Sequence, residues 1–198
     1  MHVALLGLGL IGGSIARALR TQSGWRVTAW TPTGRGPAEA RRAGLIDVAA
    51  GSPEEATAGA DLVVLAAPPL ESLELLRGLG AAGLDGHGVT VTDVVSTKRT
   101  ITEVAAAAGV PFVGGHPMAG RETTGFGSSA AELFADRPWA ISEPVCGGDP
   151  AAVEQLARAC GAKPVRVDSA EHDRAVAAIS HLPLVASVAL VEAVLGSA

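Results

Sequence analysis

The sequence predicts an α/β fold of the Rossmann type, a doubly wound and mostly parallel sheet, followed by the start of an all-helical domain. Three observations lead to this fold class. Short apolar runs alternate with helix-forming segments along most of the chain, the first run leads directly into a glycine-rich turn and a helix pattern, and only helical patterns follow Asp168. We therefore expect one domain over residues 1–168 and the first helix of a second over residues 169–198.

The strands and helices are predicted from their apolar periodicity and from turn residues between them. Buried strands are expected at residues 2–6, 27–30, 62–66, 89–92, 110–113, 139–141 and 164–167. Helices are expected at residues 14–20, 38–43, 72–79, 100–108 and 151–160. Asp149 is the expected N-cap of the last of these helices, with Pro150 in its first turn and Gly161 after its end. Alternation of this kind favours a parallel sheet covered on both faces.

Composition limits the class of protein. Of 198 residues, 48% are hydrophobic and 18% charged, which is typical of a globular chain and not of a disordered one. The net charge is −5 and no Lys/Arg run exceeds two residues, so we expect no nucleic-acid partner. The two cysteines, Cys146 and Cys160, are too few for a disulfide framework and are expected to be reduced.

The ends of the chain bear on its location. The N-terminus has no basic segment before its short apolar run, which argues against a signal peptide and for a cytoplasmic protein. Residues 175–195 are nearly uncharged but contain His181, Pro183 and Glu192, so we expect no membrane span there. The helix predicted over this stretch is apolar all round and must be covered, for which a second copy of the chain around a two-fold axis is one solution.

The glycine turn has the pattern G-x-G-x-x-G, with Gly7, Gly9 and Gly12 placed between a strand and a helix. Gly7 permits the tight turn, Gly9 lets the backbone approach a pyrophosphate, and Gly12 allows close packing of helix on strand. The phosphates would rest on the helix N-terminus, where free N–H groups favour negative charge. The pattern therefore predicts a dinucleotide-binding domain.

The end of the second strand bears on the choice between NAD and NADP. An acidic residue there usually holds the ribose hydroxyls, but Thr31 takes its place and Arg35 follows in the next loop. Because no carboxylate repels a 2′-phosphate and Arg35 can pair with one, the sequence favours NADP or use of both cofactors. The alternative is that Arg35 is simply a solvated loop cation.

Polar residues follow two neighbouring strands at the expected ligand-binding edge of the sheet. Asp93-Val94-Val95-Ser96-Thr97-Lys98 follows the first, where Ser96 is a candidate site residue, a helix N-cap, or both. His116 follows the second, between Gly115 and Pro117. A histidine titrates near neutral pH, so this one can take a proton from an alcohol as hydride leaves the same carbon.

The remaining histidines are assigned from their surroundings. His181 lies in an apolar helical stretch and needs a partner or a cavity, which leaves a substrate pocket and a subunit interface as alternatives. His2, His87 and His172 are expected at the surface. The histidines lack metal-ligand spacing, so we expect no metal site.

Together, four motifs make the sequence resemble the prephenate dehydrogenase family, which includes arogenate and cyclohexadienyl dehydrogenases. They are Gly7-Leu8-Gly9-Leu10-Ile11-Gly12-Gly13-Ser14, Asp93-Val94-Val95-Ser96-Thr97-Lys98, Gly115-His116-Pro117-Met118-Ala119-Gly120 with Glu122, and Ser180-His181-Leu182-Pro183. The first occurs in many dinucleotide enzymes, whereas all four in this order are far more specific.

The resemblance implies oxidative decarboxylation of prephenate to 4-hydroxyphenylpyruvate, in tyrosine biosynthesis, with hydride transfer to NAD or NADP. It implies that His116 accepts the proton of the C4 hydroxyl, that Ser96 orients this hydroxyl, and that Glu122 and His181 line the substrate site. It also implies cofactor contacts along the first motif, including Leu10 and Ile11, and at Ala67 and Pro68.

The sequence departs from the family pattern in two places. The family usually continues into a helical dimerisation domain, of which we expect only the first helix before Ala198. Leu184 stands where many members have a second histidine. Three other functions remain open: arogenate dehydrogenase, a nicotinamide enzyme of the hydroxyacid or imine class, and a non-enzymatic dinucleotide-binding module. The hydroxyacid and imine class generally uses a lysine on a later helix, and this chain has only Lys98 and Lys163.

Overall fold

A single sheet forms the centre of the computed structural model, which describes residues 1–84 and 88–196 and so leaves His87 outside. Within those residues the sheet has eight strands in the order β3-β2-β1-β4-β5-β6-β7-β8. Their bounds are β1 (His2–Leu6), β2 (Arg26–Trp30), β3 (Val48–Ala49), β4 (Leu62–Leu65), β5 (Thr90–Asp93), β6 (Phe112–Pro117), β7 (Pro138–Val145) and β8 (Lys163–Arg166). Each predicted strand is present, and the two-residue β3 is an addition.

The strand directions confirm a mostly parallel sheet. Strands β1 to β6 pair in parallel, whereas β7 runs antiparallel to β6, and β8 is parallel to β7. The order reverses beside β1, whose neighbours are β2 and β4. A reversal of this kind opens a crevice at the carboxyl ends of the strands, where ligands of doubly wound sheets bind.

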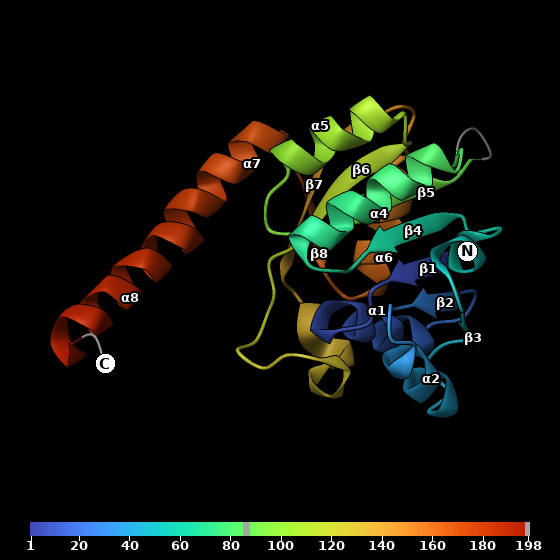
Figure 1. Ribbon diagram of the computed structural model, residues 1–198, viewed down its shortest axis with the longest axis horizontal. Helices are drawn as coiled ribbons and strands as arrows, with labels where there is room; N and C mark the ends of the chain where they lie inside the picture. Colours follow the sequence, from blue (N-terminus) through green and yellow to red (C-terminus); the bar gives the residue numbers. More distant parts are fainter. Residues whose placement is uncertain (85–87, 197–198) are drawn as a thin grey trace.

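Helices cover both faces of the sheet (Figure 1). They are α1 (Leu10–Arg20), α2 (Arg35–Arg42), α3 (Pro53–Thr57), α4 (Pro69–Ala81), α5 (Arg99–Ala108), α6 (Pro150–Ala159), α7 (Ser169–Val176) and α8 (Leu182–Leu195). The side chains of β1 show why two faces need cover. Val3 and Leu5 belong to one apolar core with α1 and α6, whereas Ala4 and Leu6 belong to a second with α4 and α5.

Two helix starts test the predicted caps. The carboxylate of Asp149 accepts a hydrogen bond from the amide of Ala151 (2.9 Å), which confirms it as the N-cap of α6. The interpretation of Ser96 as a cap is wrong. Helix α5 begins at Arg99, two residues later than that cap requires, and its first amides are bound by the side chain of Asp173 from α7.

Helix α7, the π-helical turn η3 (Ala177–His181) and α8 form one continuous helix that projects away from the sheet (Figure 1). Ser169, His172 and Val176 are buried on α7, but no residue of η3 or α8 is. The helix Ser169–Leu195 has 27 residues and a mean hydropathy of 1.9 over its most apolar window. By length and composition alone it could cross a membrane.

Two glycines of α4 give a matched test of how closely this helix packs on α5. A Cβ on Gly80 would lie 2.7 Å from the carbonyl oxygen of Ala108, whereas a Cβ on Gly78 would meet nothing within 4 Å. We expect Gly80→Ala to lower the free energy of unfolding by about 1–3 kcal/mol. Gly78→Ala should raise it by about 0.5–1 kcal/mol through its helix propensity. Urea denaturation of both variants checks this, and equal effects would contradict the close packing.

Candidate active site

The glycine turn has the geometry that a bound pyrophosphate requires. Gly7 has a φ of +115°, and a Cβ there would lie 2.3 Å from the carbonyl oxygen of Ala66. A Cβ on Gly12 would lie 2.3 Å from the carbonyl oxygen of Gly7, so α1 packs closely on the strand end. Gly9 faces open space and leaves the first amides of α1 without a side-chain cap. These amides suit an anion.

A cavity of about 1220 Å³ extends from this turn and receives most of the predicted cofactor residues. Gly7, Gly9, Thr31, Ala67 and Pro68 line it. The hydroxyl of Thr31 is buried and has no hydrogen-bond partner in the described structure. The cavity thus fits a dinucleotide at its phosphate and ribose positions.

Not every predicted cofactor residue lines this cavity. Leu10, Ile11 and Gly12 form the first turn of α1 and are not among the residues that line the cavity. Arg35 is exposed at the first position of α2, and within residues 1–84 and 88–196 it forms no ion pair. Its side chain is therefore available to a ligand that reaches the end of β2.

A buried ion pair between Asp93 and Lys98 joins the ends of β5 and β6. The Asp93 carboxylate also accepts hydrogen bonds from the amides of Val95 and Gly115, each at 3.0 Å. Lys98 donates from Nζ to the carbonyl oxygen of Gly115 at 2.7 Å. Burial raises the pKa of Asp93 and lowers that of Lys98, while their mutual attraction opposes both changes. Sequence reasoning missed this role because no pattern marks a buried lysine.

His116 lies in β6, immediately after Gly115, and is 9% exposed. The strand bulges between Val113 and Gly115, which re-aims the residues that follow. A Cβ on Gly115 would lie 2.6 Å from the carbonyl oxygen of Asp93, so only glycine fits here. Burial lowers the pKa of His116 to about 3, with help from the nearby Lys98 and His172, whereas Asp173 opposes the shift. The ring is thus neutral near pH 7 and keeps a lone pair for a proton, while the same burial lowers its basicity.

The prediction of a surface position for His172 is wrong. This ring is 4% exposed, and its Nε2 lies 3.0 Å from Nδ1 of His116. Its Nδ1 lies 2.9 Å from Oδ1 of Asp173. Partial burial works against ionisation of Asp173, but hydrogen bonds from the Arg99 amide, the His172 ring and the Lys98 amide outweigh it and lower the pKa of this carboxyl.

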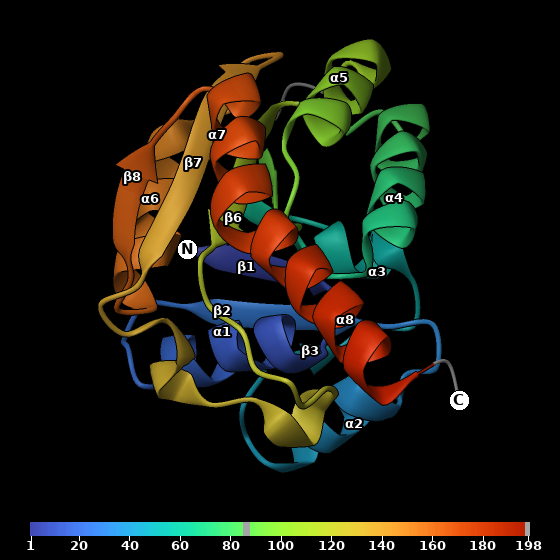
Figure 2. The same cartoon turned by 90° about the vertical axis from the view of Figure 1, so that its left-hand side faces the viewer.

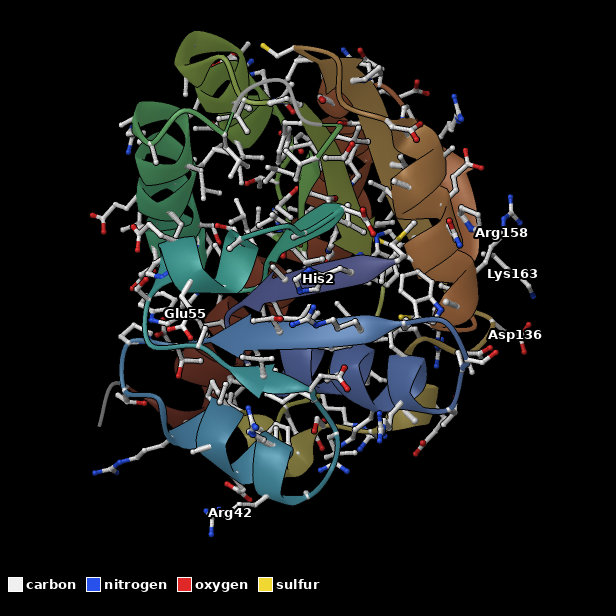
Figure 3. All side chains as sticks on the ribbon, turned by 90° about the vertical axis from the view of Figure 1, so that its right-hand side faces the viewer. His2, Arg42, Glu55, Asp136, Arg158 and Lys163 are labelled. Carbon is white, nitrogen blue, oxygen red and sulfur yellow. The ribbon has the colours of Figure 1, made fainter. Side chains whose placement is uncertain are left out.

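His2 also departs from the surface prediction. Its ring is half-buried at the start of β1 (Figure 3), where Nδ1 lies 2.9 Å from the carbonyl oxygen of Gly59 and Nε2 lies 2.8 Å from Oγ1 of Thr28. These contacts hold the edge of the sheet opposite to the ligand-binding one. His2 is therefore a structural residue.

The three other predicted site residues are all exposed. Ser96 is exposed in the turn after β5, the strand beside β6. Glu122 is exposed in the loop after β6. His181 is exposed on η3, yet close enough for its charge to lower the pKa of His116. In the described residues no three His, Cys, Asp or Glu side chains gather as a metal site would need.

Fold and site together define a Rossmann-type dinucleotide-binding domain with a buried histidine at the ligand-binding edge of its sheet. Residues 15–167 match the family model described as "Prephenate dehydrogenase, nucleotide-binding domain". The chain belongs to the prephenate dehydrogenase family.

Relatives and solved structures agree with this membership. The chain is 34% identical over 196 residues to a prephenate dehydrogenase of Bacillus subtilis, which covers 96% of this chain and 52% of the relative. The chain spans about half the length of the first curated relatives it matches.

Two solved structures superpose on the whole chain. Synechocystis arogenate dehydrogenase does so with a TM-score of 0.85 and 32% identity, over 70% of its own chain. A prephenate dehydrogenase from A. aeolicus, in complex with hydroxyphenyl propionate and NAD+, gives 0.88 and 25% identity over 71% of its own chain. The Rossmann-type fold predicted from the sequence is confirmed.

Removal of the buried Lys98 should lower the free energy of unfolding far more than removal of an exposed lysine. Lys98→Met leaves the Asp93 carboxylate buried and unpaired, so we expect the free energy of unfolding to fall by about 3–5 kcal/mol. Lys163 is the matched control, because its pair with Asp136 (2.8 Å) is exposed at the edge of the sheet (Figure 3). Lys163→Met should leave the free energy of unfolding nearly unchanged. A loss for Lys98→Met that is as small as the loss for Lys163→Met, both measured by urea denaturation, would show that the Asp93–Lys98 pair is not needed.

Proposed function

We propose that this protein is a prephenate dehydrogenase, which oxidises and decarboxylates prephenate to 4-hydroxyphenylpyruvate. The observation that carries the proposal is the neutral, buried His116 at the carboxyl end of β6, the strand next to the turn that holds Ser96. Family membership and the curated relatives support the same reaction. Arogenate, which has an amino group in place of the keto group, is the second candidate, supported by the similarity to an arogenate dehydrogenase.

His116 acts as the proton acceptor in this proposal. A bound nicotinamide would supply the acceptor for the hydride from C4 of the substrate. His116 accepts the proton of the C4 hydroxyl, which Ser96 orients, and returns it to the phenolate oxygen once CO2 has left and the ring is aromatic. Glu122 and His181 bind the substrate from the loop after β6 and from the projecting helix.

The cofactor proposal is NADP or use of both dinucleotides. Thr31 lines the cavity at the position where a carboxylate would repel a 2′-phosphate. Arg35, at the start of α2, forms no ion pair in the described structure. The solved A. aeolicus relative holds NAD+. The phosphates would rest on the first amides of α1, beside Gly7 and Gly9.

The assembly proposal is a homodimer of a cytoplasmic protein, paired through the helical region over residues 169–198, which starts the second domain. Helix α8 exposes large apolar side chains around its whole circumference, including Leu182, Val185, Leu190 and Val194. Burial of each is worth about 1.5–3 kcal/mol. A second copy that packs its own α8 here would cover them.

Substitution of His116 tests the reaction. We expect His116→Ala to lower kcat by about 10²- to 10⁴-fold, because the general base is lost, with cofactor affinity unchanged. His2→Ala, which removes a structural ring at the opposite edge, is the control and should keep kcat. NAD(P)H absorbance with prephenate and, separately, arogenate gives the rates. If the parent chain binds a cofactor but oxidises neither substrate, the non-enzymatic dinucleotide module is the correct interpretation.

Substitution of Thr31 tests the cofactor. Thr31→Asp introduces an acceptor for the 2′-hydroxyl and repels a 2′-phosphate, so we expect kcat/KM to shift toward NAD. The matched control is Thr33→Asp, two residues further along the same cavity wall. An unchanged NAD to NADP ratio in Thr31→Asp would mean that this end of β2 does not contact the ribose.

Charge on α8 tests the dimer. Light scattering across a dilution series should give a dimer for the parent chain and a monomer for Val185→Glu/Leu190→Glu, because carboxylates are costly in an apolar interface. The control is Arg42→Glu, on α2 and away from α8 (Figure 3). This variant should stay dimeric. A parent chain that is monomeric at every concentration would rule the dimer out, and binding to lipid vesicles would indicate a membrane as the covering surface.

A further inference from the structure

We propose that His172 and Asp173 are positioning residues, which hold His116 in the tautomer that carries its hydrogen on Nδ1 and leaves the lone pair of Nε2 free. The inference rests on the proposed function, in which His116 receives the proton of the substrate. It explains why the His116 ring contacts a polar side chain of α7, more than fifty residues later in the chain, and why a second polar side chain of α7 lies next to that one.

The hydrogen bonds fix the direction of each donor in turn. The Asp173 carboxylate can only accept, so Nδ1 of His172, at 2.9 Å, must donate to it. A neutral His172 then has its lone pair on Nε2. That atom lies 3.0 Å from Nδ1 of His116, so His116 must donate from Nδ1. The lone pair of His116 is thereby placed on Nε2.

Asp173 is itself held in place from a different element. Its Oδ1 accepts from the amide of Lys98 at 2.7 Å, and its Oδ2 accepts from the amide of Arg99 at 3.0 Å. These are the first amides of α5, where the helix dipole favours a negative charge. The carboxylate therefore stays ionised and keeps its orientation, and the direction of the whole chain of hydrogen bonds follows from it.

The free lone pair on Nε2 is what the chemistry requires. Nδ1 is occupied by His172, so Nε2 is the nitrogen left for a substrate, and no described residue bonds to it. In the other tautomer this nitrogen would present a hydrogen to the substrate hydroxyl and could not accept its proton. After the transfer, Nδ1–H still donates to His172, so the protonated ring keeps its orientation.

One competing arrangement would reverse the order. A positively charged His172 would donate from both nitrogens, and His116 would then accept at Nδ1 and carry its hydrogen on Nε2. The ring of His172 is only 4% exposed, and burial of a charged ring is unfavourable. We therefore infer that both rings are neutral, with the Asp173 carboxylate as their common orienting group.

The tautomer can be measured directly in the whole chain, with neither substrate nor cofactor present. Long-range ¹H–¹⁵N spectra of histidine-labelled protein near neutral pH separate protonated from unprotonated ring nitrogens, and His116→Gln assigns the His116 signals. We expect His116 to carry hydrogen on Nδ1. His172→Phe keeps the ring volume but removes the acceptor, so hydrogen should move to Nε2. His172→Gln supplies an amide oxygen as acceptor and should keep it on Nδ1.

Kinetics add a readout that a merely structural role would not give. We expect His172→Phe to lower kcat by about 10²-fold or more, with KM for the cofactor unchanged, and His172→Gln to recover most of the loss. A parent spectrum with hydrogen on Nε2 of His116, or a His172→Phe spectrum identical to the parent, would overturn the proposal. If His172→Phe does not fold, the parent and His172→Gln spectra still decide.

The two proposals fail in different ways. A tautomer that shifts as expected in a chain that oxidises neither substrate would refute the proposed function and leave the positioning role intact. Oxidation of prephenate or arogenate by a chain whose His116 tautomer does not respond to position 172 would refute the positioning role alone.

Discussion

The buried ion pair between Asp93 and Lys98 fixes the part of the molecule from which the candidate site is built. The pair joins the end of β5 to Gly115 of β6, through bonds to both the amide and the carbonyl of that glycine. The backbone position of His116, the next residue, follows from these bonds. The same turn delivers the amides of Lys98 and Arg99 to Asp173, so one short segment orients β6 and anchors α7. The two buried charges thus join β5 to β6, and the backbone amides of the same segment hold α7.

The sequence was informative where the structure depends on neighbouring residues. The glycine turn, the alternation of strands and helices and the cap at Asp149 depend on local backbone chemistry, and the structure agrees with the prediction at each of them. His116 could be singled out because it lies between Gly115 and Pro117 at the end of a predicted strand.

His172 could not be predicted in the same way. Its partner in β6 is 56 residues away, and the surrounding Glu171-His172-Asp173-Arg174 is typical of a solvated helix start. Only the packing of α7 against α5 and β7, visible in Figure 2, buries this face of the helix. The cap at Ser96 was wrong for a related reason, since the carboxylate that binds the first amides of α5 comes from Asp173, more than seventy residues later. Long-range partners of this kind leave no periodic signal.

One continuous helix joins the candidate site, at α7, to the exposed apolar surface of α8. Its first two turns, on α7, bury Ser169, His172 and Val176 against the domain, whereas the rest exposes apolar side chains to solvent. His172 and Asp173 therefore lie on the last part of the helix that packs against the domain, just before the exposed part begins. The hydrogen bonds from the first amides of α5 to Asp173 lie on the packed part of this helix, before the exposed apolar part begins. The positioning role proposed for His172 therefore depends on how α7 packs on α5 and β7.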